Sequence, residues 1–228
     1  MASRRRGGRV VAPERVEVLE AVADRVARLD RPATVAVDGP DGAGKTVLAD
    51  ELAGLVRGAV RASLDDFHHP RAHRHALGRT GTTVWERGFD YAAVRRELLE
   101  PWRRGPRTAY RLRWHDLVTD TYVEEPAHLV PADGVLLVDG VFAQRPELAS
   151  LWDLVVYVDA PDEVRTARMA ERDGVPADPD HPDQRRYLEA QRLYRDTCRP
   201  RLSADLVVDN TDAHRPRVLG PQEAAEGA

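Results

Sequence analysis

The stretch that decides the fold occupies residues 39–46 and reads Gly39-Pro40-Asp41-Gly42-Ala43-Gly44-Lys45-Thr46. It fits the phosphate-loop pattern G-x-x-x-x-G-K-[ST] without a mismatch. In such a loop the glycines let backbone N–H groups turn inward around phosphate oxygens, and Lys45 reaches the outer phosphates as a point charge. The hydroxyl of Thr46 can ligate Mg²⁺, and a helix that starts near Gly44 directs its positive end at the same phosphates.

Lys45 is also the sole lysine of the chain, because every other residue among its 34 Lys and Arg is an arginine. Arginine replaces lysine on a solvated surface at little cost, but not where a compact ammonium is needed. The remaining lysine therefore favours a working phosphate loop over a glycine-rich turn that contains lysine by chance. A small GTPase would need a second lysine, in an N-K-x-D motif, and is excluded.

The composition predicts one cytoplasmic globular domain. The chain has 228 residues, of which 42% are hydrophobic, and a net charge of −4, which argues against a protein that coats nucleic acid or an anionic membrane. No apolar stretch approaches the roughly 18 residues of a spanning helix, and the basic N-terminus lacks the apolar segment of a secretory signal. A single cysteine, Cys198, excludes an intramolecular disulfide framework and a cysteine-based zinc site.

Apolar patterns outside the loop predict alternating strands and helices. The expected strands are near-continuous apolar runs at 33–37, 59–64, 135–138, 154–158 and 206–208, and the expected helices are at 13–29, after the loop, 91–103, 161–172 and 185–199. Runs of this kind indicate a parallel sheet covered on both faces. We therefore expect an α/β fold with a five-stranded parallel sheet and helices on both faces, with ligands beyond the carboxyl ends of the strands.

The same patterns predict a single domain over residues 13–212. A flexible arm is expected at 1–12 and a flexible tail at 213–228. Residues 67–90 show no clear period and are expected to form a long loop. The proline- and aspartate-rich stretch at 174–183 is expected to be a flap that closes to exclude water.

Carboxylates follow two of the predicted strands. Asp65 and Asp66 come directly after the second strand, where one could accept the proton of an attacking hydroxyl and the other could contact the acceptor or help to hold Mg²⁺. Asp139 ends the third strand, where a second carboxylate would organise the metal. The competing interpretation is structural: strand-end aspartates often form turns or cap helices.

Four segments together resemble the uridine kinase family of P-loop kinases, especially its actinobacterial branch. They are the phosphate loop, SLDDFH at 63–68, VLLVDGVF at 135–142 and YLEAQRLYRDTCRPRLSADLVVDNTD at 187–212. The resemblance covers about residues 32–212. It implies the P-loop kinase fold, ATP and Mg²⁺ as cofactors, phosphorylation of the 5′-hydroxyl of a pyrimidine nucleoside, and a homo-oligomer.

The resemblance also implies roles for individual residues. Asp65 matches the catalytic aspartate and a metal-site residue, and Arg165 and Arg168 match helix arginines that bind phosphates and the transferring group. Arg172 and Asn210 would lie near adenine, beside the loop residues Gly39, Asp41, Gly42, Ala43, Gly44, Lys45 and Thr46. On the acceptor side the resemblance places Phe67, His68 and Asp90, the last holding ribose hydroxyls.

The segment expected to read the base departs from the family pattern. His115 stands where relatives have Tyr, Asp120 where they have the His that reads the pyrimidine edge, and Tyr122 where they have Arg. Trp114 and His115 remain candidates to contact the acceptor. The acceptor is therefore a pyrimidine nucleoside or another hydroxyl compound, such as a sugar, a vitamin precursor or a natural-product intermediate. A third hypothesis is a non-catalytic ATP-binding regulator.

Residues 68–75 include four histidines. Spaced histidines can hold zinc, but neither a helical pair nor a cysteine is predicted nearby. A basic loop that touches the acceptor and a plain solvated loop are the alternatives.

Overall fold

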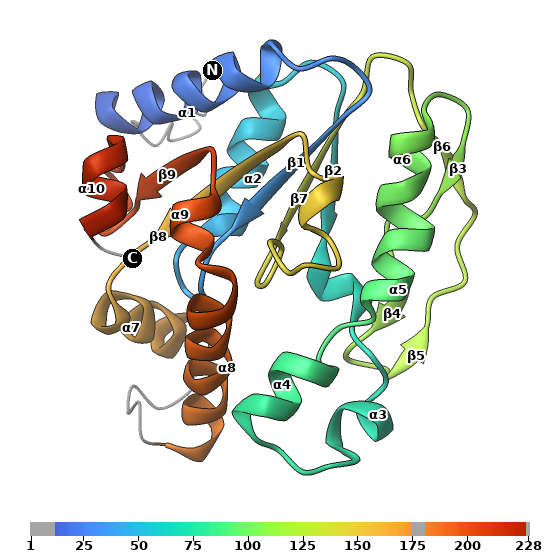
Figure 1. Ribbon diagram of the computed structural model, residues 1–228, viewed down its shortest axis with the longest axis vertical. Helices are drawn as coiled ribbons and strands as arrows, with labels where there is room; N and C mark the ends of the chain where they lie inside the picture. Colours follow the sequence, from blue (N-terminus) through green and yellow to red (C-terminus); the bar gives the residue numbers. More distant parts are fainter. Residues whose placement is uncertain (1–11, 175–180, 227–228) are drawn as a thin grey trace, which may run out of the picture.

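The computed structural model describes residues 12–174 and 181–226, which surround a twisted central sheet (Figure 1). Within these residues the sheet has six strands in the order β10-β9-β8-β1-β7-β2. The strands are β1 (Ala33–Asp38), β2 (Ala59–Ser63), β7 (Val135–Gly140), β8 (Leu154–Asp159), β9 (Leu206–Asp209) and β10 (Arg217–Val218). The five predicted parallel strands are confirmed, and the unpredicted β10 adds an antiparallel edge.

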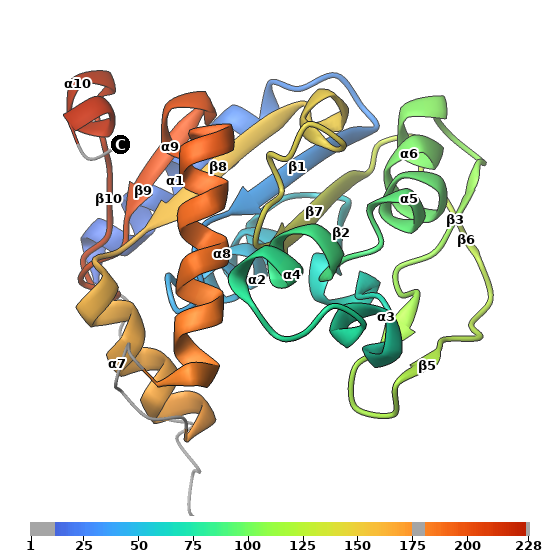
Figure 2. The same ribbon diagram turned by 60° about the horizontal axis from the view of Figure 1, so that its bottom comes forward.

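The predicted helices are present with small shifts in their ends. They are α1 (Pro13–Ala27), α2 (Lys45–Leu55), α7 (Asp162–Asp173) and α8 (Pro182–Cys198), and the segment at 91–103 consists of α5 (Tyr91–Ala93), the π-helical η2 (Val94–Leu99) and α6 (Glu100–Arg104). Figure 2 shows α8 crossing one face of the sheet while α1 and α2 cover the other. None of the described helices is long and apolar enough to span a bilayer.

Alternate residues of the central strands form two hydrophobic cores. Val35 and Val37 of β1 face one core with side chains from α1 and α2. Ala36 faces the other core, which includes Trp102 of α6 and Tyr194 of α8. Because both faces are covered, the strands are buried on both sides, which explains their near-continuous apolar sequence.

The segment at 67–90 contains helices that the sequence does not predict. It follows η1 (Leu64–Phe67) and contains α3 (Arg71–His75) and α4 (Gly81–Arg87). Thr80 starts α4 with a capping box, in which its hydroxyl accepts from the Thr83 N–H at 3.2 Å. Trp85 then packs its ring 5.7 Å from the ring of Tyr194 on α8. The expectation of a loop is wrong here, because tertiary packing stabilises a helix of weak intrinsic propensity.

The chain after Ala213 differs from the predicted tail. Residues 217–218 form β10, and α10 (Pro221–Glu226) follows. The Arg201 guanidinium donates to the carbonyls of Ala224 at 2.8 Å and Glu223 at 3.1 Å, which attaches α10 to α9 (Pro200–Ser203). Most of the predicted arm (1–11) and the middle of the predicted flap (175–180) lie outside the described residues.

Short elements complete the fold. They are the pair β3 (Ala109–Tyr110) and β6 (His128–Leu129), the pair β4 (His115–Asp116) and β5 (Thr121–Tyr122), and the 3₁₀ turn η3 (Ala149–Leu151).

Candidate active site at the carboxyl edge of the sheet

The phosphate loop connects β1 to α2 and leaves donors open. Gly39, at φ 148°, has no room for a side chain, since an added Cβ would lie 2.1 Å from the Val158 carbonyl oxygen. Gly44 starts α2 in the left-handed region, at φ 95°. Within the described part of the chain, the N–H groups of Gly44, Lys45 and Thr46 donate no hydrogen bond. Such open donors at a helix N-terminus fit the phosphates of a nucleotide.

The functional side chains of the loop are already held in place. Lys45 is 8% exposed, and its ammonium donates to the Pro40 carbonyl at 2.9 Å. The Thr46 hydroxyl donates to Asp139 Oδ2 at 2.6 Å, and Arg61 of β2 donates to Asp139 Oδ1 at 2.9 Å. A hydroxyl beside a carboxylate is the kind of oxygen donor set that suits Mg²⁺. Arg61 is not predicted from the sequence as a site residue, although a charged residue inside an apolar strand signals a partner.

Asp65 stands on η1 and faces the loop across a cavity. Its side chain is solvent-accessible and lines this cavity, whose walls surround the carboxyl and partly desolvate it. This desolvation raises the pKa of Asp65 to about 6, the Asp41 carboxylate acts in the same direction, and the Lys45 ammonium opposes it. The structure thus brings Asp65, Asp41 and Lys45 together. A carboxylate with a pKa near 6 is suited to accept a proton near neutral pH.

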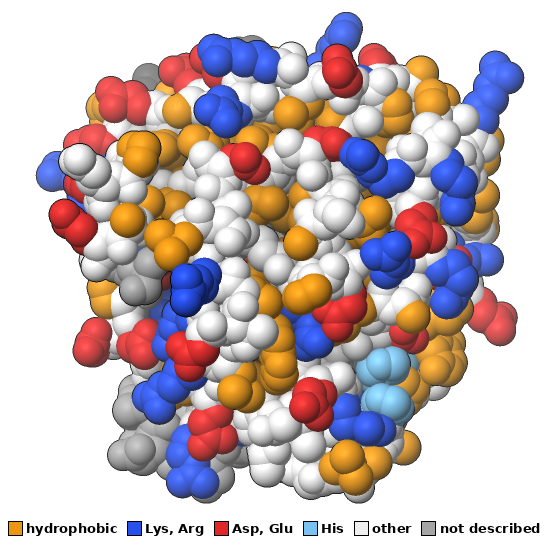
Figure 3. Space-filling model, viewed as in Figure 1, with side chains coloured by type: hydrophobic (Ala, Val, Ile, Leu, Met, Phe, Trp, Pro, Cys, Tyr) orange, Lys and Arg blue, Asp and Glu red, His pale blue; other side chains and the backbone are white. Residues whose placement is uncertain are grey.

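The cavity has a volume of about 530 Å³, and its lining includes residues of the loop, α3, α4, α7 and α8. Its lining includes His68 and Phe89, whose rings lie 4.1 Å apart. His68 Nδ1 donates to the Asp65 carbonyl at 2.8 Å, and burial lowers the pKa of the ring to about 4. The ring is therefore neutral at pH 7, and its Nε2 can accept a hydrogen bond. Figure 3 shows histidine and arginine side chains side by side over α3, at the lower right.

Four of the predicted acceptor residues lie outside the cavity lining. Phe67 is fully buried in the hydrophobic core, and Asp90 Oδ1 accepts the Ala93 N–H at 2.9 Å as the cap of α5. Asp66 forms an ion pair with Arg113 at 3.0 Å. The Arg96 guanidinium covers the ring of Trp114 at 5.1 Å.

His115, a fifth predicted acceptor residue, is also absent from the lining. It is fully buried, with Nε2 3.3 Å from an Asp120 carboxylate oxygen. Within the described residues, no three His, Cys, Asp or Glu side chains gather as a metal site, so the histidines at 68–75 form none.

Arg165 lies beneath the loop and is 1% exposed. Its Nε donates to the Ala160 carbonyl at 3.0 Å, and one Nη donates to the Asp41 carbonyl at 3.1 Å and to Gln191 at 3.0 Å. The other Nη pairs with Asp162. With these partners, Arg165 positions the loop backbone.

Arg168 and Asn210 connect the loop to the end of β9. Arg168 donates to the carbonyls of Asn210 at 2.9 Å and Thr211 at 3.1 Å, and reaches the Gly42 carbonyl at 3.5 Å. The Asn210 amide donates to the Ala43 carbonyl at 2.7 Å. Arg172, one turn after Arg168 on α7, lines the cavity.

Asp38 is a buried carboxylate that is not predicted from the sequence as a site residue. It accepts the Gly39 N–H at 2.8 Å, the Gln144 amide at 2.9 Å and the Tyr194 hydroxyl. Burial raises the pKa of this carboxyl. Asp38 therefore joins the start of the loop to the segment after β7 and to α8. Its signal in the sequence is a charged residue that ends an apolar strand.

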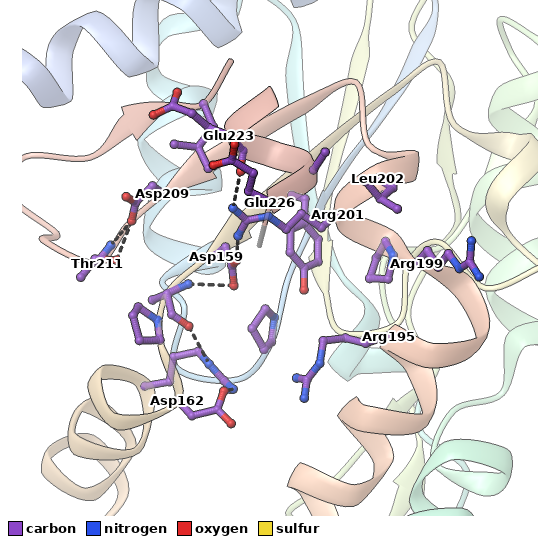
Figure 4. Close-up of a pocket in the computed structure, with 18 of the residues that line it drawn as sticks. Asp159, Asp162, Arg195, Arg199, Arg201, Leu202, Asp209, Thr211, Glu223 and Glu226 are labelled. Carbon is purple, nitrogen blue, oxygen red and sulfur yellow. Dashed lines mark hydrogen bonds and ion pairs between the residues drawn. The ribbon is translucent and has the colours of Figure 1, made fainter. Parts of the chain in front are cut away.

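A larger cavity, of about 910 Å³, lies between β8, α9 and α10 (Figure 4). Figure 4 shows Arg201 directed at Asp159, with which it forms an ion pair. Arg217 likewise pairs with Asp209 and Glu223. Asp65 lines the smaller cavity and not this one, so the smaller cavity is the candidate site for the acceptor.

The sheet order, the phosphate loop and the helices on both faces define a P-loop kinase fold. No family model matches the chain. The chain is 27% identical to uridine kinase of Lactobacillus helveticus (strain DPC 4571) over 158 residues. This match covers 64% of this chain and 70% of that relative. The predicted resemblance to uridine kinases is therefore confirmed.

Two solved structures share the fold. One is a possible uridine kinase from Bacillus stearothermophilus, with a TM-score of 0.65, 22% identity, and coverage of 84% of this chain and 97% of the other. The second is a candidate fructose transport system kinase from Silicibacter sp. TM1040, with a TM-score of 0.63, 23% identity, and coverage of 83% and 98%. The fold therefore occurs in kinases with different names.

Proposed function

We propose that the protein transfers the γ-phosphoryl group of ATP to a hydroxyl group of a small molecule bound in the 530 Å³ cavity. The observation that carries the proposal is the position of Asp65, a carboxylate with a raised pKa on the cavity wall, within electrostatic reach of Lys45. A base and a phosphate-binding cation within electrostatic reach of each other are the components of phosphoryl transfer to a hydroxyl.

Each residue of the site has its own role in the proposed reaction. The N–H groups of Gly44, Lys45 and Thr46 would hold the phosphates of ATP, which supplies the γ-phosphoryl group. Thr46 and Asp139 would hold Mg²⁺, which neutralises phosphate charge. Asp65 accepts the proton of the acceptor hydroxyl as its oxygen bonds to phosphorus and the phosphorus–oxygen bond to ADP breaks. Lys45 stabilises the charge on the transferring group.

Two acceptor classes compete. The uridine kinase relative supports the 5′-hydroxyl of a pyrimidine nucleoside. The absence of Trp114 and His115 from the cavity lining favours a different hydroxyl compound, because only Leu117 of the segment expected to read the base lines the cavity. We also propose that the enzyme is cytoplasmic, forms a homo-oligomer and binds neither nucleic acid nor membranes.

ADP release from Mg-ATP tests the proposal with uridine, cytidine, other nucleosides, sugars and vitamins as acceptors. Asp65→Asn is expected to lower kcat by about 10²- to 10⁴-fold and to keep ATP binding, because it removes the base alone. Asp66→Asn is the matched control, since Asp66 pairs with Arg113 outside the lining. ATP binding without ADP release in every case would favour the regulator, and normal turnover of Asp65→Asn would exclude Asp65 as the base.

A further inference from the structure

Asp41 belongs to the phosphate loop, but it lines the same 530 Å³ cavity as Asp65 and His68. Burial raises the pKa of Asp65, and the charge of Asp41 adds to this rise. Burial lowers the pKa of His68, and the charge of Asp41 opposes this fall. The Asp41 carboxylate therefore lies within electrostatic reach of both the proposed base and the ring beside it.

A network of hydrogen bonds fixes the position of the Asp41 carboxylate. The side-chain amide of Gln191, a residue that is 3% exposed, donates to Asp41 Oδ2 at 2.8 Å. Arg165 donates to the side-chain oxygen of Gln191 at 3.0 Å and to the backbone carbonyl of Asp41 at 3.1 Å. Because a guanidinium only donates, Arg165 holds the amide oxygen of Gln191 toward itself and leaves the amide nitrogen for Asp41. The carboxylate can therefore leave this position only by breaking its bond to a buried amide.

The second carboxylate oxygen of Asp41 has no such partner. Within residues 12–174 and 181–226, Oδ1 accepts no hydrogen bond, and Asp41 forms no ion pair. The phosphates of a nucleotide do not suit this oxygen, because two negative charges repel each other. A hydroxyl does suit it, because a hydroxyl donates a charge-assisted hydrogen bond to a carboxylate. The side chain of Asp41 thus fits the acceptor better than the nucleotide that the sequence predicts for it.

We propose that Asp41 is a specificity-determining residue, whose Oδ1 accepts a hydrogen bond from a second hydroxyl of the acceptor while the reacting hydroxyl lies at Asp65. The acceptor is then a polyhydroxy compound, such as a polyol, a sugar or the ribose of a nucleoside. Asp90, to which the resemblance assigns the ribose hydroxyls, caps α5 instead and lies outside the cavity lining. This inference rests on the proposed function and deepens it by naming the substrate class.

Acceptor pairs that differ by one hydroxyl test the contact. The pairs are uridine with 3′-deoxyuridine, ribose with 3-deoxyribose, and glycerol with 1,3-propanediol. ADP release from Mg-ATP is measured at about pH 8, where Asp65 is ionised. In a pair that reacts, the member without the hydroxyl should have a kcat/KM about 10- to 100-fold lower, because a hydrogen bond to a charged group is lost. Equal turnover of both members in every pair overturns the inference and leaves the proposed function standing.

Asp41→Ala separates the contact from other effects of the substitution. Without the carboxylate, the two members of a reactive pair should have kcat/KM values within about threefold of each other, because neither makes the contact. A loss that is common to both members, through the loop or Asp65, cancels in this ratio. If Asp41→Ala does not fold, Asp41→Asn keeps the shape of the side chain and an oxygen for Gln191. Asp41→Asn should lower the ratio by at least about threefold, because the group that faces the cavity is then an uncharged amide.

Asp24→Ala is the control for the loss of negative charge. Asp24 is exposed on α1, which covers the face of the sheet opposite α8 (Figure 2), so this variant should keep the wild-type ratio. A preference for the additional hydroxyl that survives in both Asp41 variants contradicts the inference. A raised KM for ATP with an unchanged ratio would mean that Asp41 serves the nucleotide. An Asp41-dependent preference for 2-amino-1,3-propanediol over glycerol would identify an ammonium group, and not a hydroxyl, as the partner.

Binding measured by calorimetry separates failure of the inference from failure of the proposed function. Tighter binding of the polyhydroxy member that is lost in Asp41→Ala, without ADP release from any acceptor, supports the contact and contradicts the kinase proposal. If no member of any pair binds or reacts while ATP binds, both proposals fail.

Discussion

The two halves of the candidate site are held together by different kinds of contact. Around the phosphate loop, Lys45, Arg165, Arg168 and Asn210 all donate to backbone carbonyls within residues 40–43. Around the acceptor cavity, the lining includes side chains from α3, α4, α7 and α8, which lie far apart in the sequence. In the first half, side chains hold the loop through hydrogen bonds to its backbone, whereas the shape of the second half depends on how distant elements dock. The phosphate half of the site can therefore be predicted from a sequence motif, and the acceptor half cannot.

Substitution of Lys45 is expected to cause the largest loss of kcat/KM. Lys45→Ala should lower kcat/KM by about 10²- to 10³-fold, since it removes a donor aimed at transferring charge. Lys45→Arg should be nearly as inactive, because a planar guanidinium does not replace an ammonium in a site that is 8% exposed. Steady-state kinetics with varied ATP measures both. An active Lys45→Arg variant would show that the loop tolerates any cation.

Asp38 tests whether the two halves are coupled, because it contacts the loop, Gln144 and Tyr194. Asp38→Ala should lower the free energy of unfolding by about 2–4 kcal/mol, since buried donors lose their acceptor. Urea denaturation measures this. Asp50→Ala, at a side chain that is 63% exposed, should change stability by less than about 0.5 kcal/mol. Similar values for the two variants would contradict the coupling.

Substitutions at two aromatic positions test which residues contact the acceptor. His68→Ala should raise the KM for the acceptor by about tenfold, because it removes a hydrogen-bond acceptor from the cavity wall. Trp114→Phe should change that KM by less than about twofold, since Trp114 lies outside the lining. Both effects are read from acceptor titrations at saturating ATP. A larger effect at Trp114 would restore the role that the sequence predicts for it.

The smallest effect concerns the pKa of Asp65. Carbon NMR of the metal-free, nucleotide-free protein should show this carboxyl titrating near pH 6. Below that pH the protonated carboxyl cannot accept a proton, so activity should fall as pH decreases. Asp41→Asn should shift the titration to lower pH, because it removes a negative charge that raises the pKa. An unchanged titration would mean that desolvation alone sets the value.

The sequence by itself determined the phosphate loop, the five parallel strands and the position of Asp65 at a strand end. These features follow from local patterns: glycine spacing, apolar runs and the edge at which parallel strands end. Tertiary structure alone decided that Asp38 joins the loop to α8 and that Phe67 and His115 are buried away from the cavity. It also decided that Arg74 and Arg186 meet there, because contacts between distant segments depend on helix docking, which no local pattern encodes.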